Sequence, residues 1–417
     1  MDATKQKAGQ SLAYNVVKMA ASAPAAAFPG LKVNKSGGWV SFGNSNDFPQ
    51  EVIKISAKSP VNKSIILSTV TYICGKGVKD TAKTAEKYIG QPNPADTWDD
   101  VIERTATDYK TFGGFYGQVV LNNDGVTVST FHQDFSTVRV GVISSKGAVE
   151  TFRISSDWKK TSGQNKPIEL EVWPGINSAK IGVNYMFYHW EYEPGLALYC
   201  VPDWYHAIEY VKADGQLGVF YNNSIDNGFT PSVVISMPSN PDEDKKDAFQ
   251  ANMEEAFSGA KGASSIIVLW GENDEVKPQI TPFSASANAD IYNNIEAIIF
   301  QKIISAHRLS SPTLAGVSGS GNLSGNANEI INAYILYNYT VVEKMRRKIL
   351  DKFNTFQAIN KVADLVIDEL DVLSKIKEAG TSETATEVVD ATPEKLAAKL
   401  KRTPWLTNQL KKLMKWN

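Results

Sequence analysis

Three long stretches of the chain have the residue pattern of helices. They run over residues 203–227, 290–308 and 327–356, and six isoleucines of the second stretch recur at helical spacing. The pair Asp214-Gly215 falls inside the first stretch, where it is expected to interrupt or fray the helix. The pattern therefore predicts three long helices, of which the first is imperfect.

Two shorter helices are predicted earlier in the chain by the residues at their ends. Ser59 and Pro60 are typical of an N-cap and a first helical position, and Gly75 is typical of a helix end. Another helix is expected to begin near Thr97, because the aspartates at positions 99 and 100 interact favourably with the positive end of a helix.

Between residues 116 and 201, short apolar runs separated by turn residues predict strands. The sequence Asn-Asn-Asp-Gly at positions 122–125 is a strong hairpin signal, and an earlier hairpin is expected over residues 31–42. We expect an α+β domain built on an antiparallel sheet. The expected strands are residues 118–121, 126–130, 137–143, 149–154, 168–172, 185–192 and 196–201.

A small α/β unit follows the first long helix. The pattern predicts a strand at 233–237, an acidic amphipathic helix at 242–257, and strands at 264–270 and 276–281. A unit of this size buries too little apolar surface to be stable alone. We therefore expect neighbouring elements or partner chains to support it.

The segment between the second and third long helices is rich in serine and glycine. Residues 316–325 precede a helix, as a phosphate-binding loop does, but no Gly-Lys-Ser/Thr closes them and a helix stands where a dinucleotide fold has a strand. A flexible connector is therefore favoured over a nucleotide site. Long loops without secondary structure are uncommon and often functional, and this one has no Lys or Arg between Leu309 and Asn328.

The charge balance excludes one class of function for the chain as a whole. Its 417 residues include 43 Lys and Arg against 45 Asp and Glu, a formal net charge of −2, which is not the charge of a strongly basic nucleic-acid binder. Hydrophobic residues at 42% and charged residues at 21% are typical of globular domains. Residues 393–417 are locally basic, and this segment fits nucleic-acid binding and packing against a neighbour equally well.

Cysteine content and hydropathy bear on the compartment. Cys74 and Cys200 are too few for a zinc site of four thiolates, and we expect both thiols to be reduced. No apolar run approaches the ~20 residues of a membrane span. Asn15 and Lys18 interrupt the apolar part of the N-terminal segment, so we expect no signal peptide and a cytoplasm-like environment.

No catalytic constellation emerges from the sequence. The four histidines form no His-Glu-x-x-His motif, and no Gly-x-Ser-x-Gly sequence is present. Acidic pairs such as Asp99 and Asp100 occur at helix starts or on faces expected to be solvated. A nuclease would need carboxylates clustered around two metal ions, and it is kept as the less favoured alternative. We expect no cofactor and no metal.

The order of these elements resembles the portal protein family of tailed double-stranded DNA bacteriophages. Asn-Gly-Phe-Thr-Pro-Ser at positions 227–232 is similar to the family's junction after its first stem helix, and Ser-Pro-Thr-Leu-Ala-Gly at positions 311–316 is similar to the segment after its second. The likeness covers about residues 45–370. Similarities to an early wing helix, to wing strands and to a clip turn occur at residues 59–75, 109–135 and 257–263.

The resemblance implies an α+β, multi-domain subunit that assembles as a ring. Its β-rich wing is followed by two stem helices that flank a small α/β clip. The implied parts are an N-terminal wing (1–202), a first stem helix (203–227), a clip (228–283), a second stem helix (284–309), a tunnel loop (310–326), a long helix with the C-terminal wing (327–379), and a helical crown or C-terminal tail (380–417).

The same resemblance implies a head–tail connector without enzymatic activity. Twelve subunits would form a ring at one capsid vertex, the channel for DNA packaging and ejection. The implied partners are double-stranded DNA in transit, the large terminase, the head–tail adaptor and the major capsid protein, with no membrane. The implied location is the virion, with the host cytoplasm during assembly. The main alternative is a connector or tail component that conducts no DNA.

The resemblance also implies which residues serve the channel. An uncharged tunnel loop touches DNA without holding it, because each phosphate that a protein neutralises strengthens binding and its salt dependence. Lys302 and Arg308, the nearest bases, would form either sparse positive rings around the channel or salt bridges between subunits. The loop residues expected to face DNA are Ser310, Ser311, Thr313, Gly316, Ser318, Gly319, Ser320, Gly321, Asn322, Ser324, Gly325 and Asn326, and the clip residues expected to contact the adaptor are Asp242, Glu243, Asp244, Glu254 and Glu255.

Overall fold

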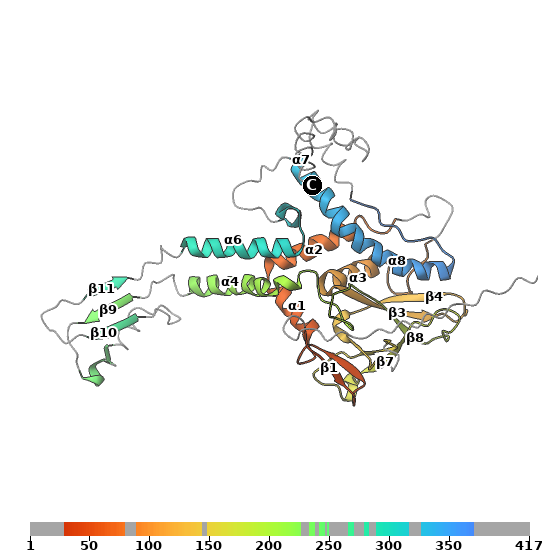
Figure 1. Cartoon of the computed structure of the whole chain (residues 1–417), viewed down its shortest axis with the longest axis horizontal. Coiled ribbons are helices and arrows are strands. Elements are labelled where there is room, and N and C mark those ends of the chain that lie inside the picture. Colours follow the sequence, from red (N-terminus) through yellow and green to blue (C-terminus); the bar gives the residue numbers. More distant parts are fainter. Residues whose placement is uncertain are drawn as a thin grey trace, which may run out of the picture.

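A body of helices and sheet carries a projection of two paired helices (Figure 1). A small three-stranded sheet lies at the far end of this projection. The computed structural model describes residues 29–79, 89–143, 148–226, 233–237, 242–246, 248–249, 266–270, 279–282, 289–316 and 327–370.

Two N-terminal helices of the body, α2 and α3, begin at the predicted signals, and α2 also ends at its predicted glycine. α1 (Phe48–Lys58) is followed by α2 (Pro60–Cys74), whose N-cap Ser59 accepts a hydrogen bond from the backbone of its third residue. α3 (Trp98–Phe112) begins with a capping box formed by Thr97 and its third residue, an aspartate. Gly75 and Gly113 follow α2 and α3 with φ of +58° and +82°, conformations that glycine adopts without steric cost. These helix predictions are confirmed.

The body's main sheet has six strands in the order β4-β3-β8-β7-β6-β5, and β1 and β2 form a separate hairpin as predicted. Most pairs are antiparallel, but β7 and β8 pair in parallel, so the expectation of a purely antiparallel sheet is wrong. The strands are β1 (Leu31–Asn34), β2 (Trp39–Phe42), β3 (Gly114–Leu121), β4 (Val128–Gln133), β5 (Val138–Val140), β6 (Thr151–Ile154), β7 (Ile168–Val172) and β8 (Asn184–Trp190).

The predicted strand at 196–201 does not form. Only an isolated bridge between Leu196 and Glu193 forms there, and Tyr199, Cys200 and Val201 are buried as coil. Tyr199 donates its hydroxyl to the backbone oxygen of Val40 and accepts the backbone N–H of Val140. The ring of Tyr199 also stacks on Phe42 at 4.0 Å. The apolar run therefore reflects packing of a coil segment in the core.

One face of the six-stranded sheet is covered by helices. Phe353 of α8 (Glu343–Asn360) packs edge-to-face against both Trp98 of α3 and Phe187 of β8. This places α3 and α8 side by side over the sheet, as Figure 1 shows.

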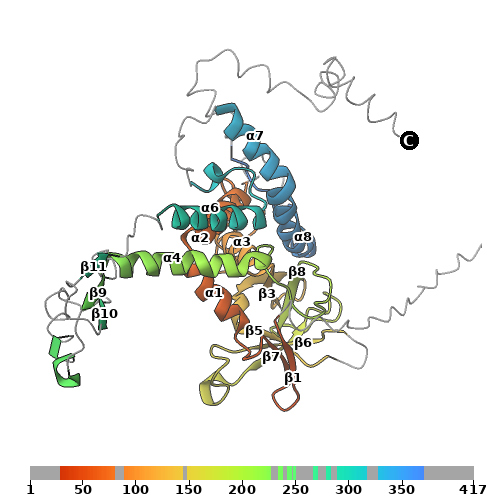
Figure 2. The same ribbon diagram turned by 60° about the vertical axis from the view of Figure 1, so that its left-hand side comes forward.

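The projection consists of α4 (Ile208–Asp226) and α6 (Ala289–Ala306), which lie side by side in two views (Figures 1 and 2). α4 leads to the small sheet and α6 returns from it. The helix α4 continues through Asp214 and Gly215, so the predicted interruption is wrong. A β-carbon on Gly215 would lie 3.0 Å from that of Lys58, so glycine here allows α4 to approach the end of α1 rather than forming a turn.

The small sheet has the order β10-β9-β11. β10 (Ile266–Trp270) runs parallel to β9 (Val233–Met237), and β11 (Gln279–Pro282) runs antiparallel to it. The three strand predictions are confirmed. Of the helix predicted at 242–257, residues 243–246 and 248–249 are helical, and residues 247 and 250–257 lie outside the described residues.

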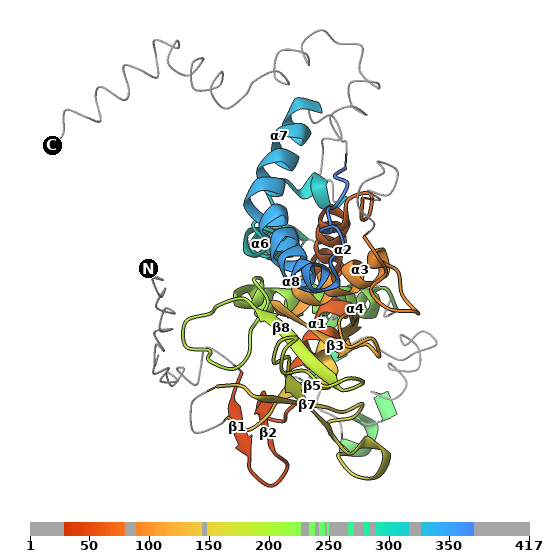
Figure 3. The same ribbon diagram turned by 90° about the vertical axis from the view of Figure 1, so that its right-hand side faces the viewer.

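The third long helix contains an irregular turn. α7 (Ala327–Tyr337) passes through a π-helical turn at Asn338–Val342 into α8, and the three form one continuous path (Figure 3). The path ends four residues beyond the predicted residue 356, at Asn360. The predicted cap residue Asn326 lies outside the described residues. Within the described part of the chain, no helix is long and apolar enough to cross a membrane.

Candidate functional site at the base of the paired helices

The first residues of the Ser/Gly segment lie directly after α6, at the base of the projection. Ser310 and Ser311 lead into a short 3-10 turn, Pro312–Ala315, which contains Thr313 and is followed by Gly316 in the left-handed conformation. We call residues 310–316 the loop root. The other predicted loop residues, Ser318, Gly319, Ser320, Gly321, Asn322, Ser324, Gly325 and Asn326, lie outside the described residues.

Side chains of neighbouring helices bind the loop root. The hydroxyl of Tyr72 on α2 donates to the backbone oxygen of Leu314 at 2.6 Å, and that of Ser64 donates to the oxygen of Ala315 at 2.6 Å. The Ser310 hydroxyl donates in turn to the oxygen of Ala333 on α7. Leu314 and Ala315 are buried. The segment therefore begins from a fixed position between α2 and α7.

The first turn of α2 contacts both helices of the projection. Asp214 of α4 accepts hydrogen bonds from the Ser59 hydroxyl and from the backbone N–H of Val61. His307, which follows α6, lies 2.8 Å through Nε2 from Oδ1 of Asn62. Burial, reinforced by two nearby cations, holds the pKa of His307 well below its ordinary value, so the ring is neutral and Nε2 is the donor.

A buried cation shares an acidic partner with one of the two predicted basic residues. Lys110 of α3 is fully buried and its Nζ lies 2.8 Å and 3.0 Å from the two carboxylate oxygens of Asp203. Arg308 reaches the same carboxylate at 3.5 Å, while about half of its side chain stays exposed. Arg308 thus has an acidic partner within its own chain. Lys302 is exposed and forms no ion pair with any residue that the structure describes.

No local sequence pattern indicates Lys110, Asn62 or His307 as parts of this site. Each is a polar residue inside an apolar helical pattern, and its partner lies far along the chain, 93 residues away for Lys110 and 245 for Asn62. The N-cap signal at Ser59 was present, but it does not indicate that a second helix supplies a carboxylate.

The outer half of the projection is exposed on most sides. Residues 294–298 of α6 are all exposed, and the apolar side chains of Val219, Ile295 and Ile298 are 57%, 41% and 54% exposed. Across the pair, the Tyr221 hydroxyl donates to Glu296 at 3.2 Å. Two helices that bury so little apolar surface gain little stability from packing on each other.

The predicted acidic contact residues are exposed at the far end. Asp242 and Glu243 pair with Lys245 and Lys246 at 4.0 Å and 2.8 Å, each at the i,i+3 spacing of one helical turn. Asp244 is exposed. Glu254 and Glu255 lie outside the described residues.

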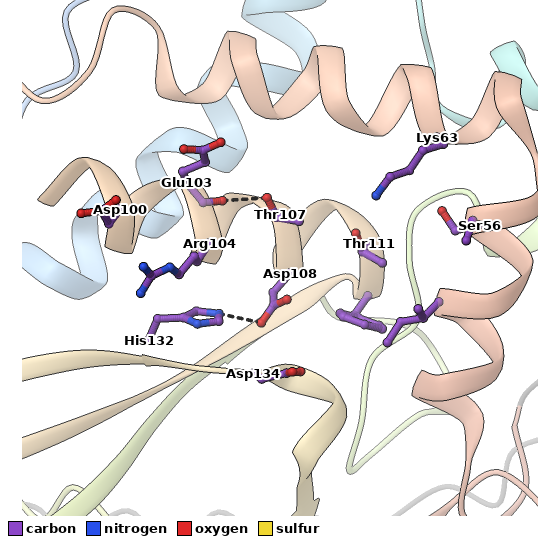
Figure 4. Close-up of a pocket in the computed structure, with 13 residues that line it drawn as sticks. Ser56, Lys63, Asp100, Glu103, Arg104, Thr107, Asp108, Thr111, His132 and Asp134 are labelled. Carbon is purple, nitrogen blue, oxygen red and sulfur yellow. Dashed lines mark hydrogen bonds and ion pairs between the residues drawn. The ribbon is translucent and has the colours of Figure 1, made fainter. Parts of the chain in front are cut away.

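A nuclease would need its carboxylates together in a cavity, and a cavity of about 510 Å³ lies between α1, α2, α3 and β4 (Figure 4). Asp108, at its floor, accepts hydrogen bonds from His132 at 2.8 Å and from the backbone N–H of Phe135. Burial raises the pKa of Asp108, against the opposite effect of His132. The pair joins α3 to β4. Asp100 is engaged in the cap of α3 and Asp134 in the turn after β4. Among the described residues, no three His, Cys, Asp or Glu side chains are grouped to hold a metal.

The comparisons with known proteins identify the family. The model of the family described as phage portal protein matches residues 67–356. This chain belongs to the phage portal protein family. Portal proteins are structural and not enzymes. The match begins within α2 and ends within α8, and it includes α3, the six-stranded sheet, the projection and the loop root. No curated protein matches the portal chain.

Solved structures share the portal fold at low sequence identity. One, titled as the virion of a native gene transfer agent particle, has a TM-score of 0.52 and 13% identity, and covers 84% of this chain and 94% of its own. Two neck structures of such particles, computed with C12 symmetry for the native and C6 symmetry for the empty particle, have TM-scores of 0.51 and 14% identity. They cover 88% and 84% of this chain, and 93% and 94% of their own.

Proposed function

We propose that this chain forms a ring of twelve subunits at one vertex of a phage capsid, through which DNA is packaged and ejected. The observation that carries the proposal is the projection, whose outer half leaves Val219, Ile295 and Ile298 exposed and ends in a sheet of three short strands. Neither is stable alone. A ring of subunits would cover these surfaces. The neck structure of the native gene transfer agent particle, which has a related fold, was computed with C12 symmetry.

Within the ring we assign each part of the chain a place. The paired helices are the stem, the small sheet with its flanking residues is the clip, and the six-stranded sheet with α2 and α3 belongs to the wing. The proposed parts are wing 1–202, first stem helix 203–227, clip 228–283, second stem helix 284–309, tunnel loop 310–326, long helix and C-terminal wing 327–379, and crown or tail 380–417.

The tunnel loop, residues 310–326, contacts DNA in transit. It carries no charged side chain, so it forms no ion pair with phosphate and offers only backbone groups and small polar side chains. Such contacts are weak and independent of sequence, which suits DNA that must keep moving. Lys302 is the better candidate for a positive ring, because Arg308 is partly neutralised by Asp203.

The partners follow from the two ends of the subunit. The clip binds the large terminase during packaging and the head–tail adaptor afterwards, through the exposed acids Asp242, Glu243 and Asp244 and through Glu254 and Glu255. The wing contacts the major capsid protein. The protein is part of the virion and assembles in the host cytoplasm.

Shortening the loop tests the channel role. Deleting residues 318–325 leaves the loop root and its hydrogen bonds in place, so we expect rings that still assemble but package or retain DNA poorly. The matched control replaces the same eight residues by a Gly/Ser sequence of equal length, and we expect near-normal packaging. The measurement is DNA content per particle and phage yield. Unchanged yield with the shortened loop contradicts the proposal.

A further inference from the structure

Both helices of the projection and the loop root contact one helix at the base, α2. The first turn of α2 and its N-cap form hydrogen bonds with Asp214 of α4 and with His307, the residue that follows α6. Further along, Ser64 and Tyr72 of the same helix bind the loop root. One helix of fifteen residues therefore contacts both stem helices and the beginning of the tunnel loop.

The contacts in the first turn form a continuous chain. The Ser59 hydroxyl donates to Asp214 and accepts the backbone N–H of Asn62 at 3.1 Å. The Asn62 side chain donates to Ser56 at 3.1 Å and accepts from His307. Ser59, Asn62 and His307 are completely buried. A buried polar group that loses its hydrogen-bond partner destabilises the fold. We therefore expect a substitution of Asp214 to weaken the hydrogen bond between Asn62 and His307.

The far end of α2 is also fixed. Arg346 of α8 is buried and donates to the backbone oxygens of Tyr72 and Ile73 at 2.7 Å and 3.0 Å. It also pairs with Glu369. These bonds use carbonyl groups that the end of a helix leaves without partners. α2 is therefore anchored at both ends, so loss of the anchor at its first turn lowers the stability of the whole helix, including the turn that carries Tyr72.

We infer that α2 couples the position of the stem helix α4 to the loop root. α4 is far from the loop along the chain, and α2 binds Asp214 of α4 near one end and Leu314 of the loop root near the other. Asp214 is a positioning residue, because it fixes the first turn of α2 relative to α4. Tyr72 joins the last turns of the same helix to the loop root through its hydrogen bond to Leu314. The inference rests on the proposed function, because it gives the stem and loop their roles.

A double-mutant cycle tests the coupling on the full-length chain. Asp214→Ala removes the contact of α4 with α2, and Tyr72→Phe removes the hydroxyl that binds Leu314. The readout is hydrogen exchange at the amides of Leu314 and Gly316, which are hydrogen-bonded within the loop root. We expect Asp214→Ala to speed exchange there about fivefold, and to do so much less when Tyr72→Phe is present.

The matched control is Tyr210→Phe, also a change on α4, which we expect to act independently of Tyr72→Phe. If the effects of Asp214→Ala and Tyr72→Phe multiply as independent changes, the coupling is wrong. Where Asp214→Ala fails to fold, Asp214→Asn takes its place, because it keeps an acceptor oxygen, and a smaller non-additive effect is expected. The experiment uses no DNA, so a failed cycle leaves the channel proposal standing, and failure of DNA packaging leaves the cycle interpretable.

Discussion

At the scale of single residues, the base of the projection depends on buried polar groups that the chain brings together from distant positions. Sequence signals found the caps at Ser59 and Thr97, because capping is local and its partner lies three residues away. They missed Lys110 with Asp203, and Asn62 with His307, because nothing in a local pattern identifies a partner brought close by folding. Of the predicted site residues, the described ones lie at the base or tip of the projection.

The buried His307 makes stability depend on pH. Its pKa is depressed in the folded chain by burial, so between that pKa and about 6.5 the unfolded chain binds a proton that the folded chain does not. Stability is therefore expected to fall as pH decreases below about 6.5, by at most ~1.4 kcal/mol per pH unit from this group. His307→Gln keeps a donor for Asn62 and removes the titration, so its stability should change less between pH 7 and 5.

Urea unfolding at pH 7, 6 and 5 measures this difference. His206→Gln is the control, because His206 is exposed at the same base and its replacement should leave the wild-type pH profile. A His307→Gln variant with the same pH dependence as the wild type would contradict the assignment of a neutral, buried ring.

At the scale of elements, long periodic patterns predicted the helices well and misjudged details that depend on neighbours. The interruption expected at Asp214-Gly215 is absent because the glycine packs on α1 and the aspartate caps α2. The strand expected at 196–201 is a coil, since its buried apolar residues pack in the core without joining a sheet. The parallel pairing of β7 and β8 follows from topology, which local patterns do not encode. The small sheet was predicted chiefly because β9 and β10 are mainly apolar runs.

Two glycines of α4 should respond oppositely to alanine. Glycine inside a helix usually destabilises it by about 1 kcal/mol relative to alanine. Gly218 has nothing within 4 Å of an added β-carbon, so Gly218→Ala should stabilise the chain by up to about 1 kcal/mol. At Gly215 the added carbon meets Lys58, so Gly215→Ala should give no gain or a loss. Chemical denaturation of both variants measures the change in the free energy of unfolding. An equal increase in stability at the two positions would show that α4 does not pack against α1.

At the scale of the whole molecule, the account depends on surfaces that one subunit leaves uncovered. A negative charge placed on the stem would be left unpaired in a subunit interface, which costs several kcal/mol. We therefore expect Ile298→Glu to abolish the ring while the subunit stays folded, because that side chain is exposed in the single chain. Ile168→Glu on β7, at a side chain that is also exposed but lies away from the stem, should leave the ring intact. Light scattering measures the mass of the assembly, and circular dichroism shows whether the subunit is folded. Intact rings of the Ile298→Glu variant would show that the subunit interface lies elsewhere.

The net charge of −2 agrees with this account at the same scale. A chain that surrounds DNA and releases it does not need the overall positive charge of a protein that holds DNA. The near-neutral charge alone excluded only a basic nucleic-acid binder. Together with the uncharged loop and the portal family, it is consistent with a channel that does not hold DNA tightly.

The most direct test of the central claim is electron microscopy of the purified assembly, with its mass measured in parallel. The account predicts a closed ring of twelve subunits with a central channel wide enough for a DNA duplex. A filament, a solid disc or a chain that remains monomeric at high concentration would contradict it.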